Sequence, residues 1–552
     1  MTQIDQRFLD TITDLSTYSI GSLLSGGGSH PKVNEPQAWL DMYNKYQEET
    51  LKNRLGIPLI YGIDAVHGHN NVYGATIFPQ NIGLGATNNP ELVYKISEAT
   101  SLEVAATGID WTFSPCLSSP EDYRWGRTYE GFSSDPALVE KLGKAAVEGY
   151  QNALTNSGKK VVACAKHFIG DGNTEFGTGM NGLVDRGNTV LTTDELKEKL
   201  LPKYQAAIDA NVQTIMASYN SWNGVKCHGS KELLTDILKV EMGFEGFVIS
   251  DWQGIDEIPG NYKSDIITSI NAGVDMVMVS GQGQPYKKFM RLLKENVEEG
   301  SISMDRIDDA VSRILKVKLR NGLFSNPMVQ NDNLQVIGSD DHRNIARQAV
   351  RESVVVLKNE NLIPISKESK SIVVAGRGAD NLGMQCGGWT INWQGGQGDI
   401  TIGTTILDGI KESVSTETKV IHSKDGTDLG NVSGDLAIVV IGEDPYTEFF
   451  GDKDNLDLLE EDIQTINNLK DKGYKVLVLL ISGRPMNIAD HLNNWDGFAA
   501  IWLPGTEGNG VSDILFGDFQ STGKLSYPWP LNAEDGANAP ENDLLYNIGF
   551  GL

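Results

Sequence analysis

The chain has 552 residues, of which 46 are Lys or Arg and 73 are Asp or Glu, so its formal net charge is −27. This acidity argues against nucleic acid and anionic membrane surfaces as partners, because a surface of this sign repels phosphate groups. Glycine is frequent, with 60 residues and no low-complexity tract, so we expect glycines at turns and where backbone approaches a ligand.

The sequence shows no targeting segment and no disulfide or metal framework. The first residues, MTQIDQRFLDTITD, lack basic and apolar regions, so we expect no signal peptide; a cytoplasmic location and a secreted or periplasmic mature form both stay open. The longest apolar runs, such as 476–481, are far shorter than the ~20 residues of a membrane span. The cysteines lie far apart without histidines at ligand spacing, so we expect neither a zinc module nor another metal site. They are Cys116, Cys164, Cys227 and Cys386.

From residue 18 to about 322, short apolar runs alternate with amphipathic stretches. Seven runs are typical of strands: 20–28, 58–66, 111–116, 161–168, 214–220, 246–252 and 276–281. Helix-like stretches separate them, and the one at 193–210 opens with a helix-cap signature. Strands joined by helical crossovers over about 300 residues favour a (β/α)8-type TIM barrel over an open sheet.

The predicted strands end in polar side chains. These are Asp64 and His67, Lys166 and His167, Ser218 and Tyr219, and Asp251 and Trp252. In an α/β barrel the carboxyl ends of the strands line one cleft, where active sites lie. We therefore expect these side chains to meet in a binding site.

A second domain follows a polar, proline-containing linker at 323–341. Residues 342–552 begin with a predicted helix from His342 and contain strand-like runs at 371–376, 436–442, 475–482 and 497–505. Helical stretches separate these runs, which predicts an α/β sandwich domain. The predicted fold class is thus α/β, with a barrel domain over 1–322 and a sandwich domain over 342–552.

Three segments carry residues suited to chemistry on sugars. GFVISDWQGID delivers Asp251 to a strand end, where a carboxylate serves as nucleophile, base, metal ligand or helix cap. IGEDPYTEFFGD is acidic but too aromatic for a simple solvated loop. Hydrolysis of a glycosidic bond requires two carboxylates, and this loop could supply the second of them. QCGGWTINWQGGQGD carries Trp389 and Trp393, which suit either core packing or stacking on sugar rings.

Together these segments resemble glycoside hydrolase family 3, in its β-D-glucan exohydrolase and β-glucosidase branch. The resemblance extends over the whole chain. It rests on the three segments above and on YGIDAVHGHNNVYGATIFPQNIGLGA, YRWGRTYEGFSSD, ACAKHFIGDG and TIMASYNSWNGVK. It implies a barrel and a sandwich domain that form a pocket for one terminal glucosyl unit.

The resemblance also implies the roles of individual residues. Asp251 corresponds to the nucleophile, and Glu448 of the PYTE motif to the acid/base. Trp252 and Trp393 would clamp the next sugar. The implied pocket residues are Asp64, Arg127, Lys166, His167, Tyr219 and, lining it, Met216. In a retaining mechanism the two catalytic carboxyl groups are expected about 5–5.5 Å apart.

Two positions depart from the family pattern. Relatives in the plant branch carry an arginine where this chain has Glu257, and a carboxylate there would change the preferred leaving sugar. The segment 175–189 is longer than usual, and Asp185 is the candidate for the carboxylate that often supports the acid/base.

The predicted function is an exo-acting retaining β-glucosidase that needs no cofactor. Its substrates would be β-glucan oligosaccharides or aryl and alkyl β-glucosides. Alternatives are a β-xylosidase or a β-N-acetylglucosaminidase of the same family, a phosphorylase using the same intermediate, and a catalytically silent glycan-binding protein. A β-N-acetylglucosaminidase would carry a histidine where this chain has Asp171. The sequence leaves linkage preference and oligomeric state open.

Overall fold

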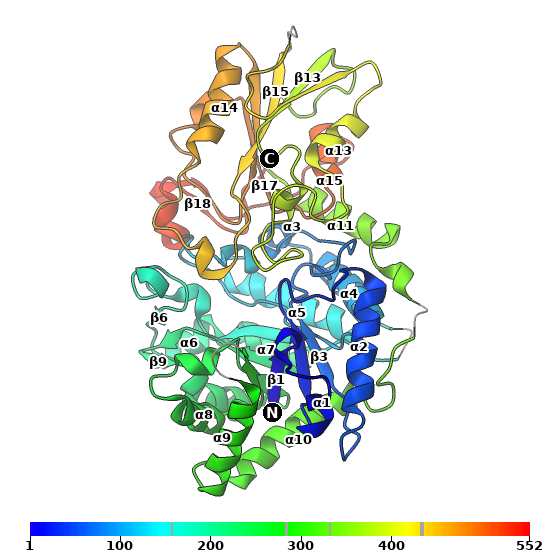
Figure 1. Cartoon of the computed structure of the whole chain (residues 1–552). Helices are drawn as coiled ribbons and strands as arrows, with labels where there is room; N and C mark the ends of the chain where they lie inside the picture. Colours follow the sequence, from blue (N-terminus) through cyan, green and yellow to red (C-terminus); the bar gives the residue numbers. More distant parts are fainter. Residues whose placement is uncertain (156–157, 282–284, 331–332, 431–434) are drawn as a thin grey trace. The chain divides into compact units, whose positions relative to one another are not determined.

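The computed structural model describes residues 1–155, 158–281, 285–330, 333–430 and 435–552, which form two compact units (Figure 1). The first unit comprises Met1–Tyr73, Val93–Ser118 and Gly143–Gly338. The second comprises Gly74–Leu92, Ser119–Leu142 and Ser339–Leu552. Within the described ranges, no helix combines the length and the apolar character needed to cross a membrane.

Eight parallel strands form the framework of the first unit. They are β1 (Thr2–Asp5), β2 (Ser22–Ser25), β3 (Ile60–Ile63), β4 (Trp111–Thr112), β5 (Cys164–Phe168), β7 (Thr214–Ala217), β10 (Phe247–Ile249) and β11 (Val277–Val279). Their order is β11-β1-β2-β3-β4 in one sheet and β10-β7-β5 in another. Isolated parallel bridges join Trp111 to Val162 and Ile249 to Met276, next to the edges of the two sheets. The predicted α/β class with parallel strands is confirmed, and closure of these strands into a barrel stays a prediction.

Seven of the strands lie within the predicted runs, whereas β1 was not among them. The four residues of β1 are all buried, yet three of them, Thr2, Gln3 and Asp5, are polar. The Gln3 side-chain NH2 group donates to Ser22 Oγ at 2.8 Å, so this buried donor has a hydrogen-bond partner. An apolar-run criterion cannot detect a strand stabilised in this way.

Helices connect successive strands of the first unit. They are α1 (Asp14–Thr17), α2 (Pro36–Thr50), α4 (Pro90–Ala106), α5 (Pro136–Asn152), α6 (Thr193–Lys199), α7 (Leu201–Asp209), η6 (Glu232–Glu241), α8 (Tyr262–Ala272), α9 (Tyr286–Glu298) and α10 (Met304–Arg320). The predicted cap at 193–210 is present, because Thr192 and Glu195 form a capping box. The predicted single helix is nevertheless two, and Pro202 lies in the first turn of the second. The short strands β6 (Asn188–Thr189), β8 (Ser221–Trp222) and β9 (Val225–Lys226) form a small additional sheet.

A six-stranded sheet forms the framework of the second unit. Its order is β12-β17-β16-β15-β13-β14, with only the β12–β17 pair antiparallel. The strands are β12 (Val355–Asn359), β13 (Ser371–Ala375), β14 (Lys419–Ser423), β15 (Leu436–Gly442), β16 (Lys475–Ile481) and β17 (Gly497–Trp502). Almost all residues of β15, β16 and β17 are buried, as expected for strands covered on both faces.

Helices cover both faces of this sheet, so the predicted α/β sandwich is confirmed (Figure 1). α14 contacts β15 and β16, whereas α3 and α11 contact β17. The helices are α3 (Asn81–Thr87), α11 (Asp340–Ser353), α12 (Leu382–Cys386), α13 (Ile406–Ser413), α14 (Glu460–Asp471) and α15 (Asn509–Leu515). A hairpin of β18 (Trp529–Pro530) and β19 (Leu544–Tyr546) lies near the carboxyl terminus. The division into 1–322, a linker and 342–552 stays a prediction.

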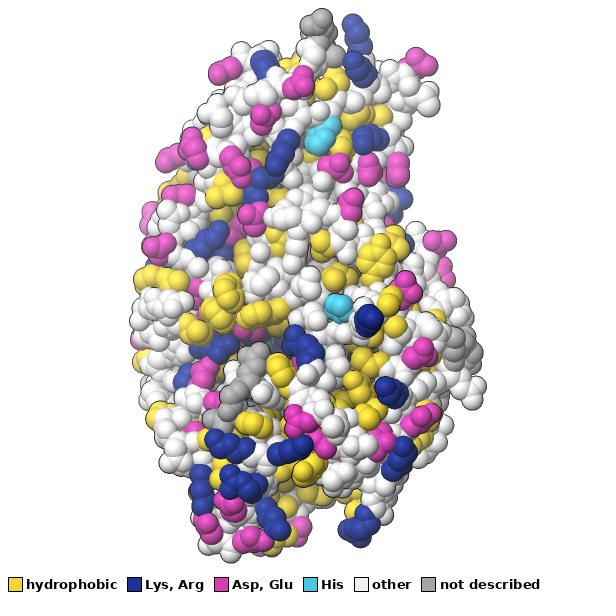
Figure 2. All heavy atoms as spheres, viewed as in Figure 1, with side chains coloured by type: hydrophobic (Ala, Val, Ile, Leu, Met, Phe, Trp, Pro, Cys, Tyr) yellow, Lys and Arg dark blue, Asp and Glu magenta, His cyan; other side chains and the backbone are white. Residues whose placement is uncertain are grey.

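Charged side chains of both signs occur together on the surface. On the face shown in Figure 2, Lys and Arg side chains are interspersed with Asp and Glu side chains. The net charge of −27 therefore does not give this face a uniformly negative character.

Candidate active site

The strand ends of the first unit bring together several predicted site residues. Asp64 follows β3 and Lys166 lies in β5, and Lys166 Nζ is 3.9 Å from Asp64 Oδ1. The Lys166 side chain is only 2% exposed, so this cation lies in a largely desolvated setting. A buried ammonium beside a carboxylate offers a fixed donor and a fixed acceptor to a polar ligand.

Asp251 lies just beyond β10, beside His167. One carboxylate oxygen, Oδ1, accepts a hydrogen bond from the Trp252 backbone N–H at 2.6 Å. The other, Oδ2, lies 3.5 Å from His167 Nε2. Asp251 is 8% exposed, so its carboxylate is largely shielded from water and oriented by two neighbours. A carboxylate oriented in this way is better suited to act as a nucleophile than to cap a helix.

A hydrogen-bonded chain orients His167 from its other nitrogen. His167 Nδ1 lies 2.7 Å from Asp171 Oδ2, and Asp171 Oδ1 accepts from Ser118 Oγ at 2.7 Å. Ligand atoms of Cys116, His167 and Asp171 lie within 4.8 Å of one another. Because Asp171 already bonds to His167 and Ser118, we interpret the group as a support for the imidazole rather than a cation site. No role was predicted for Asp171, although its spacing four residues after His167 is a signal.

Tyr219, Met216 and Trp252 occupy different environments in the same unit. The Tyr219 hydroxyl donates to the Trp252 carbonyl oxygen. Met216 is 3% exposed and lies in a hydrophobic core cluster of the first unit. Trp252 is partly buried, packs against this core, and has its ring centroid 6.2 Å from that of Phe8.

Glu257 is engaged in ion pairs. It pairs with the Arg186 guanidinium and accepts from Lys226 Nζ at 2.9 Å. The Arg186 guanidinium also lies 3.7 Å from the Tyr219 ring centroid, a cation–π contact. Any effect of Glu257 on the leaving sugar therefore involves Arg186 and Lys226 as well. Asp185 Oδ2 lies 3.6 Å from Arg186 Nε, and its suggested support of the acid/base stays a prediction.

In the second unit, Glu448 lies beside Arg127. Arg127 Nη1 is 3.8 Å from Glu448 Oε1, and both residues are buried. Arg127 also forms a bidentate pair with Glu130, with two hydrogen bonds of 2.9 Å. Trp389 Nε1 donates to the same Glu130 carboxylate at 3.1 Å. Glu130 thus fixes the arginine, and sequence reasoning missed it although it follows Arg127 by three residues.

The loop that carries Glu448 packs tightly against the segment that carries Arg127. A Cβ atom on Gly126 would lie 2.1 Å from the Glu448 carbonyl oxygen, so only glycine fits there. The Gly126 N–H also donates to Asp452 Oδ1 at 2.7 Å. These contacts place Arg127 and Glu448 side by side even though they are far apart in the sequence.

A buried ion pair anchors the same loop. Arg484 is fully buried; its Nε donates to Glu443 Oε1 at 3.1 Å and its Nη2 to the Gly451 carbonyl at 2.6 Å. Glu443 also accepts from the Tyr446 hydroxyl at 2.8 Å. Burial alone would raise the pKa of Glu443, but Arg484, Lys453 and Tyr446 lower it to about 2.

This pair makes stability depend on pH. The pKa of Glu443 is below its unfolded value of 4.5, so its stabilisation is complete above that pH and is lost as pH falls through 2. We expect Glu443→Gln to lower the free energy of unfolding at pH 5 by about 3 kcal/mol. The deficit should shrink at pH 3, measured by urea unfolding. A pH-independent deficit would contradict the ionic interpretation. The exposed Glu412→Gln is the matched control.

Trp393 belongs to a partly exposed aromatic cluster with Phe449 and Phe450, the two residues that follow Glu448. Its ring centroid lies 6.2 Å from that of Phe449 and 5.5 Å from that of Phe450. The two phenylalanine rings are 4.5 Å apart, and Phe450 is 59% exposed. Trp389, by contrast, is 6% exposed and hydrogen-bonded to Glu130, so its role is structural. Of the two tryptophans considered, Trp393 is the one available for stacking on a ligand.

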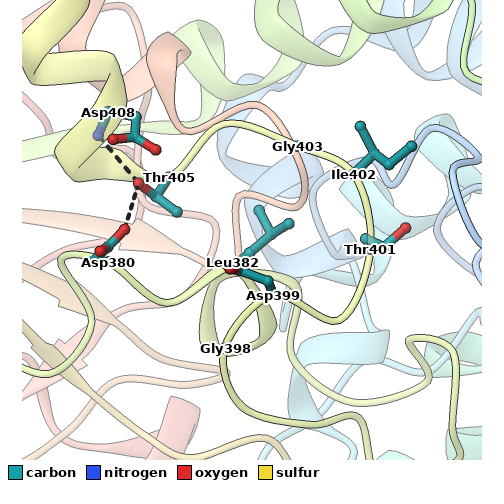
Figure 3. Close-up of a pocket in the computed structure, with 9 residues that line it drawn as sticks. All are labelled: Asp380, Leu382, Gly398, Asp399, Thr401, Ile402, Gly403, Thr405 and Asp408. Atoms are coloured by element: carbon teal, nitrogen blue, oxygen red, sulfur yellow. Dashed lines mark hydrogen bonds between the residues drawn. The ribbon is translucent and has the colours of Figure 1, made fainter.

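A hollow of about 500 Å³ lies elsewhere in the second unit (Figure 3). It contains three carboxylates, and Thr405 Oγ1 donates to Asp380 while accepting from the Asp408 N–H. Its lining is Asp380, Leu382, Gly398, Asp399, Thr401, Ile402, Gly403, Thr405 and Asp408. None of the predicted site residues is among them.

Comparison with known families agrees with these features. The description "Glycosyl hydrolase family 3 N terminal domain" matches residues 1–317, and "Glycosyl hydrolase family 3 C-terminal domain" matches residues 354–552. The chain belongs to glycoside hydrolase family 3. This family 3 protein is accordingly a glycoside hydrolase.

Similar proteins carry related names. A "Lysosomal beta glucosidase" of Dictyostelium discoideum is 33% identical over 94% of this chain and 67% of its own length. A "Beta-xylosidase" of Formosa agariphila is 32% identical over 88% of this chain and 70% of its own. The crystal structure of an exo-1,3/1,4-beta-glucanase from a Pseudoalteromonas species has a TM-score of 0.91 at 38% identity, covering 100% of this chain and 71% of that one.

Proposed function

We propose that this family 3 hydrolase is an exo-acting, retaining β-glucosidase that releases glucose from the non-reducing end of β-linked gluco-oligosaccharides and from aryl or alkyl β-glucosides. The observation that carries the proposal is the position of Asp251: buried, at a strand end, and 3.5 Å from His167. The similarity to a β-glucosidase and an exo-β-glucanase supports the substrate class.

The proposed mechanism has two displacements. Asp251 attacks the anomeric carbon while Glu448 gives its proton to the departing glycosidic oxygen. Glu448 then takes a proton from water, and the resulting hydroxide breaks the bond between glucose and Asp251. The configuration is inverted twice, so the product keeps the β configuration.

Polar residues of the site are proposed to hold the sugar. Lys166 and Asp64 offer one donor and one acceptor, and Arg127, held by Glu130, offers further donors. His167 and Tyr219 would contact hydroxyl groups, with Met216 forming part of the wall. Hydrogen bonds to buried, preoriented groups favour a substrate with matching hydroxyls and exclude an unmatched one.

A product analysis tests this function. Laminaribiose, cellobiose, gentiobiose and xylobiose are incubated side by side, and the anomer first released is identified by NMR. Release of β-glucose from gluco-disaccharides supports the proposal, whereas α-glucose as the first product would contradict retention. Repetition with phosphate present would reveal a phosphorylase through sugar phosphate.

A β-xylosidase is the second candidate, because a similar protein carries that name. Xylose lacks the hydroxymethyl group of glucose. The preference between a xyloside and a glucoside therefore depends on how much space the pocket leaves for that group. A higher kcat/KM for an aryl β-xyloside than for the matched aryl β-glucoside would favour this candidate over the first.

Trp393 is predicted to act on the leaving group. Because an aromatic ring stacks on a sugar face, Trp393→Ala should lower kcat/KM for laminaribiose by about 10-fold. β-Glucosyl fluoride, whose leaving group has no ring, should be hydrolysed at an unchanged rate. Phe450→Ala tests whether the neighbouring exposed ring shares the role. Equal losses on laminaribiose and the fluoride would contradict a leaving-group role.

A further inference from the structure

His228 is a fully buried histidine that contacts the main chain of Asp251. It lies in the short helix η5 (Cys227–Gly229), which follows the β8–β9 hairpin. Its Nε2 accepts a hydrogen bond from the Asp251 backbone N–H at 3.0 Å. The contact therefore connects the hairpin beyond β7 with the end of the neighbouring strand β10.

The hydrogen bond defines the state of the imidazole. Because Nε2 accepts, the proton of the neutral ring resides on Nδ1. Burial lowers the pKa of His228 to about 4, so the ring stays neutral and keeps this acceptor near neutral pH.

The other ring nitrogen indicates why a histidine is present. His228 Nδ1 has no hydrogen-bond partner among the described residues. A buried polar group without a partner is unfavourable, and an apolar side chain would avoid that cost. The acceptor at Nε2 is thus the property that distinguishes histidine from an apolar residue here.

The surrounding backbone leaves space for this ring. A Cβ atom on Gly254 would lie 2.3 Å from His228 Nε2, so glycine permits the close approach. The Gly254 N–H and the Ser250 hydroxyl both donate to the Asp251 carbonyl oxygen at 3.0 Å. The Asp251 N–H, its carbonyl and its carboxylate are consequently all held by hydrogen bonds.

We propose that His228 is a positioning residue for the nucleophile. By accepting from the Asp251 N–H, it fixes the backbone from which the carboxylate projects, and thereby the line along which Oδ2 approaches the anomeric carbon. A small misplacement of an attacking group slows bond formation more than it weakens ground-state binding. The inference rests on the proposed function, in which Asp251 is the nucleophile.

Three substitutions at His228 test this role. Glutamine can place an amide oxygen near the position of Nε2, asparagine is too short to do so, and leucine has no acceptor. We expect His228→Leu and His228→Asn to lower kcat/KM on an aryl β-glucoside by about 10- to 100-fold. His228→Gln should recover most of this loss. The inhibition constant of glucose should change by less than about twofold, because the orientation of attack and not sugar binding is altered.

A nearby cavity variant is the control for packing. Cys227 is fully buried in the same short helix, and Cys227→Ala should lower Tm with little effect on kcat/KM. The inference is overturned if His228→Gln and His228→Asn lose activity equally, if His228→Leu keeps full activity, or if glucose binding weakens in parallel with kcat/KM. If the wild-type protein hydrolyses the glucoside and Asp251→Ala does not, those outcomes contradict the role of His228 alone.

Discussion

Asp251→Ala is expected to lower kcat/KM on aryl β-glucosides by on the order of 10⁴-fold or more. Alanine has no group that can attack the anomeric carbon, so the covalent intermediate does not form. Both carboxylate oxygens of Asp251 are oriented by neighbours: Oδ2 lies 3.5 Å from His167 Nε2, and Oδ1 accepts a hydrogen bond from the Trp252 N–H. Steady-state hydrolysis of a nitrophenyl β-glucoside measures the loss.

A neighbouring carboxylate provides the matched control. Asp256 lies five residues later in the short helix η7 (Gly254–Glu257), and its substitution by asparagine should leave hydrolysis nearly unchanged. Added azide should enter Asp251→Ala from the face that the nucleophile normally uses, which gives α-glucosyl azide from a β-glucoside. A fully active Asp251→Ala protein would exclude Asp251 as nucleophile.

Glu448→Ala should separate the two steps of the reaction. Glycosides with poor leaving groups need the proton of Glu448, so their kcat/KM should fall by about 10³-fold, within the usual range for acid/base residues. A dinitrophenyl β-glucoside needs no protonation and should still form the intermediate. Its KM should fall, because hydrolysis of the intermediate then limits turnover.

Azide identifies the acid/base by the anomer that it forms. It should accelerate Glu448→Ala by attacking the glycosyl-enzyme, giving β-glucosyl azide, the opposite anomer to that from Asp251→Ala. Asp444→Asn is the matched control, since Asp444 is an exposed carboxylate of the same loop, paired with Arg377. Rescue of the Asp444 variant instead of the Glu448 variant would reassign the role.

Much of the framework could be predicted from the sequence. Seven of the eight strands of the first unit, and β13, β15, β16 and β17 of the second, coincide with predicted apolar runs, because strands buried on both faces are nearly continuous in apolar residues. The failures are local. β1 contains buried polar residues, one of which, Gln3, donates a hydrogen bond to Ser22. β14 is a short, mixed polar and apolar strand that was not predicted. The end of the predicted helix from His342 is the strand β12, since β-branched valines pair readily in a sheet.

The predicted site residues were found through position, whereas their partners were not. Asp251 and Lys166 stand out because they interrupt apolar runs at strand ends. Glu130, Asp171, His228 and Arg484 have no such context, and each acts by contacting a residue remote in the sequence or on another turn. Sequence patterns report burial and local periodicity, and they carry no distances between segments.

The sequence by itself determined the family, the α/β fold class and the candidate catalytic residues, and it predicted glycines where backbone approaches another group. The tertiary structure decided where those approaches occur: Gly126 lies against the Glu448 carbonyl and Gly254 against His228. It also decided that Glu257 forms ion pairs with Arg186 and Lys226. Trp389 is buried, which leaves Trp393 as the tryptophan that can stack on a ligand. Each of these outcomes depends on atoms brought together by folding, because hydrogen bonds and ion pairs form only within a few ångströms.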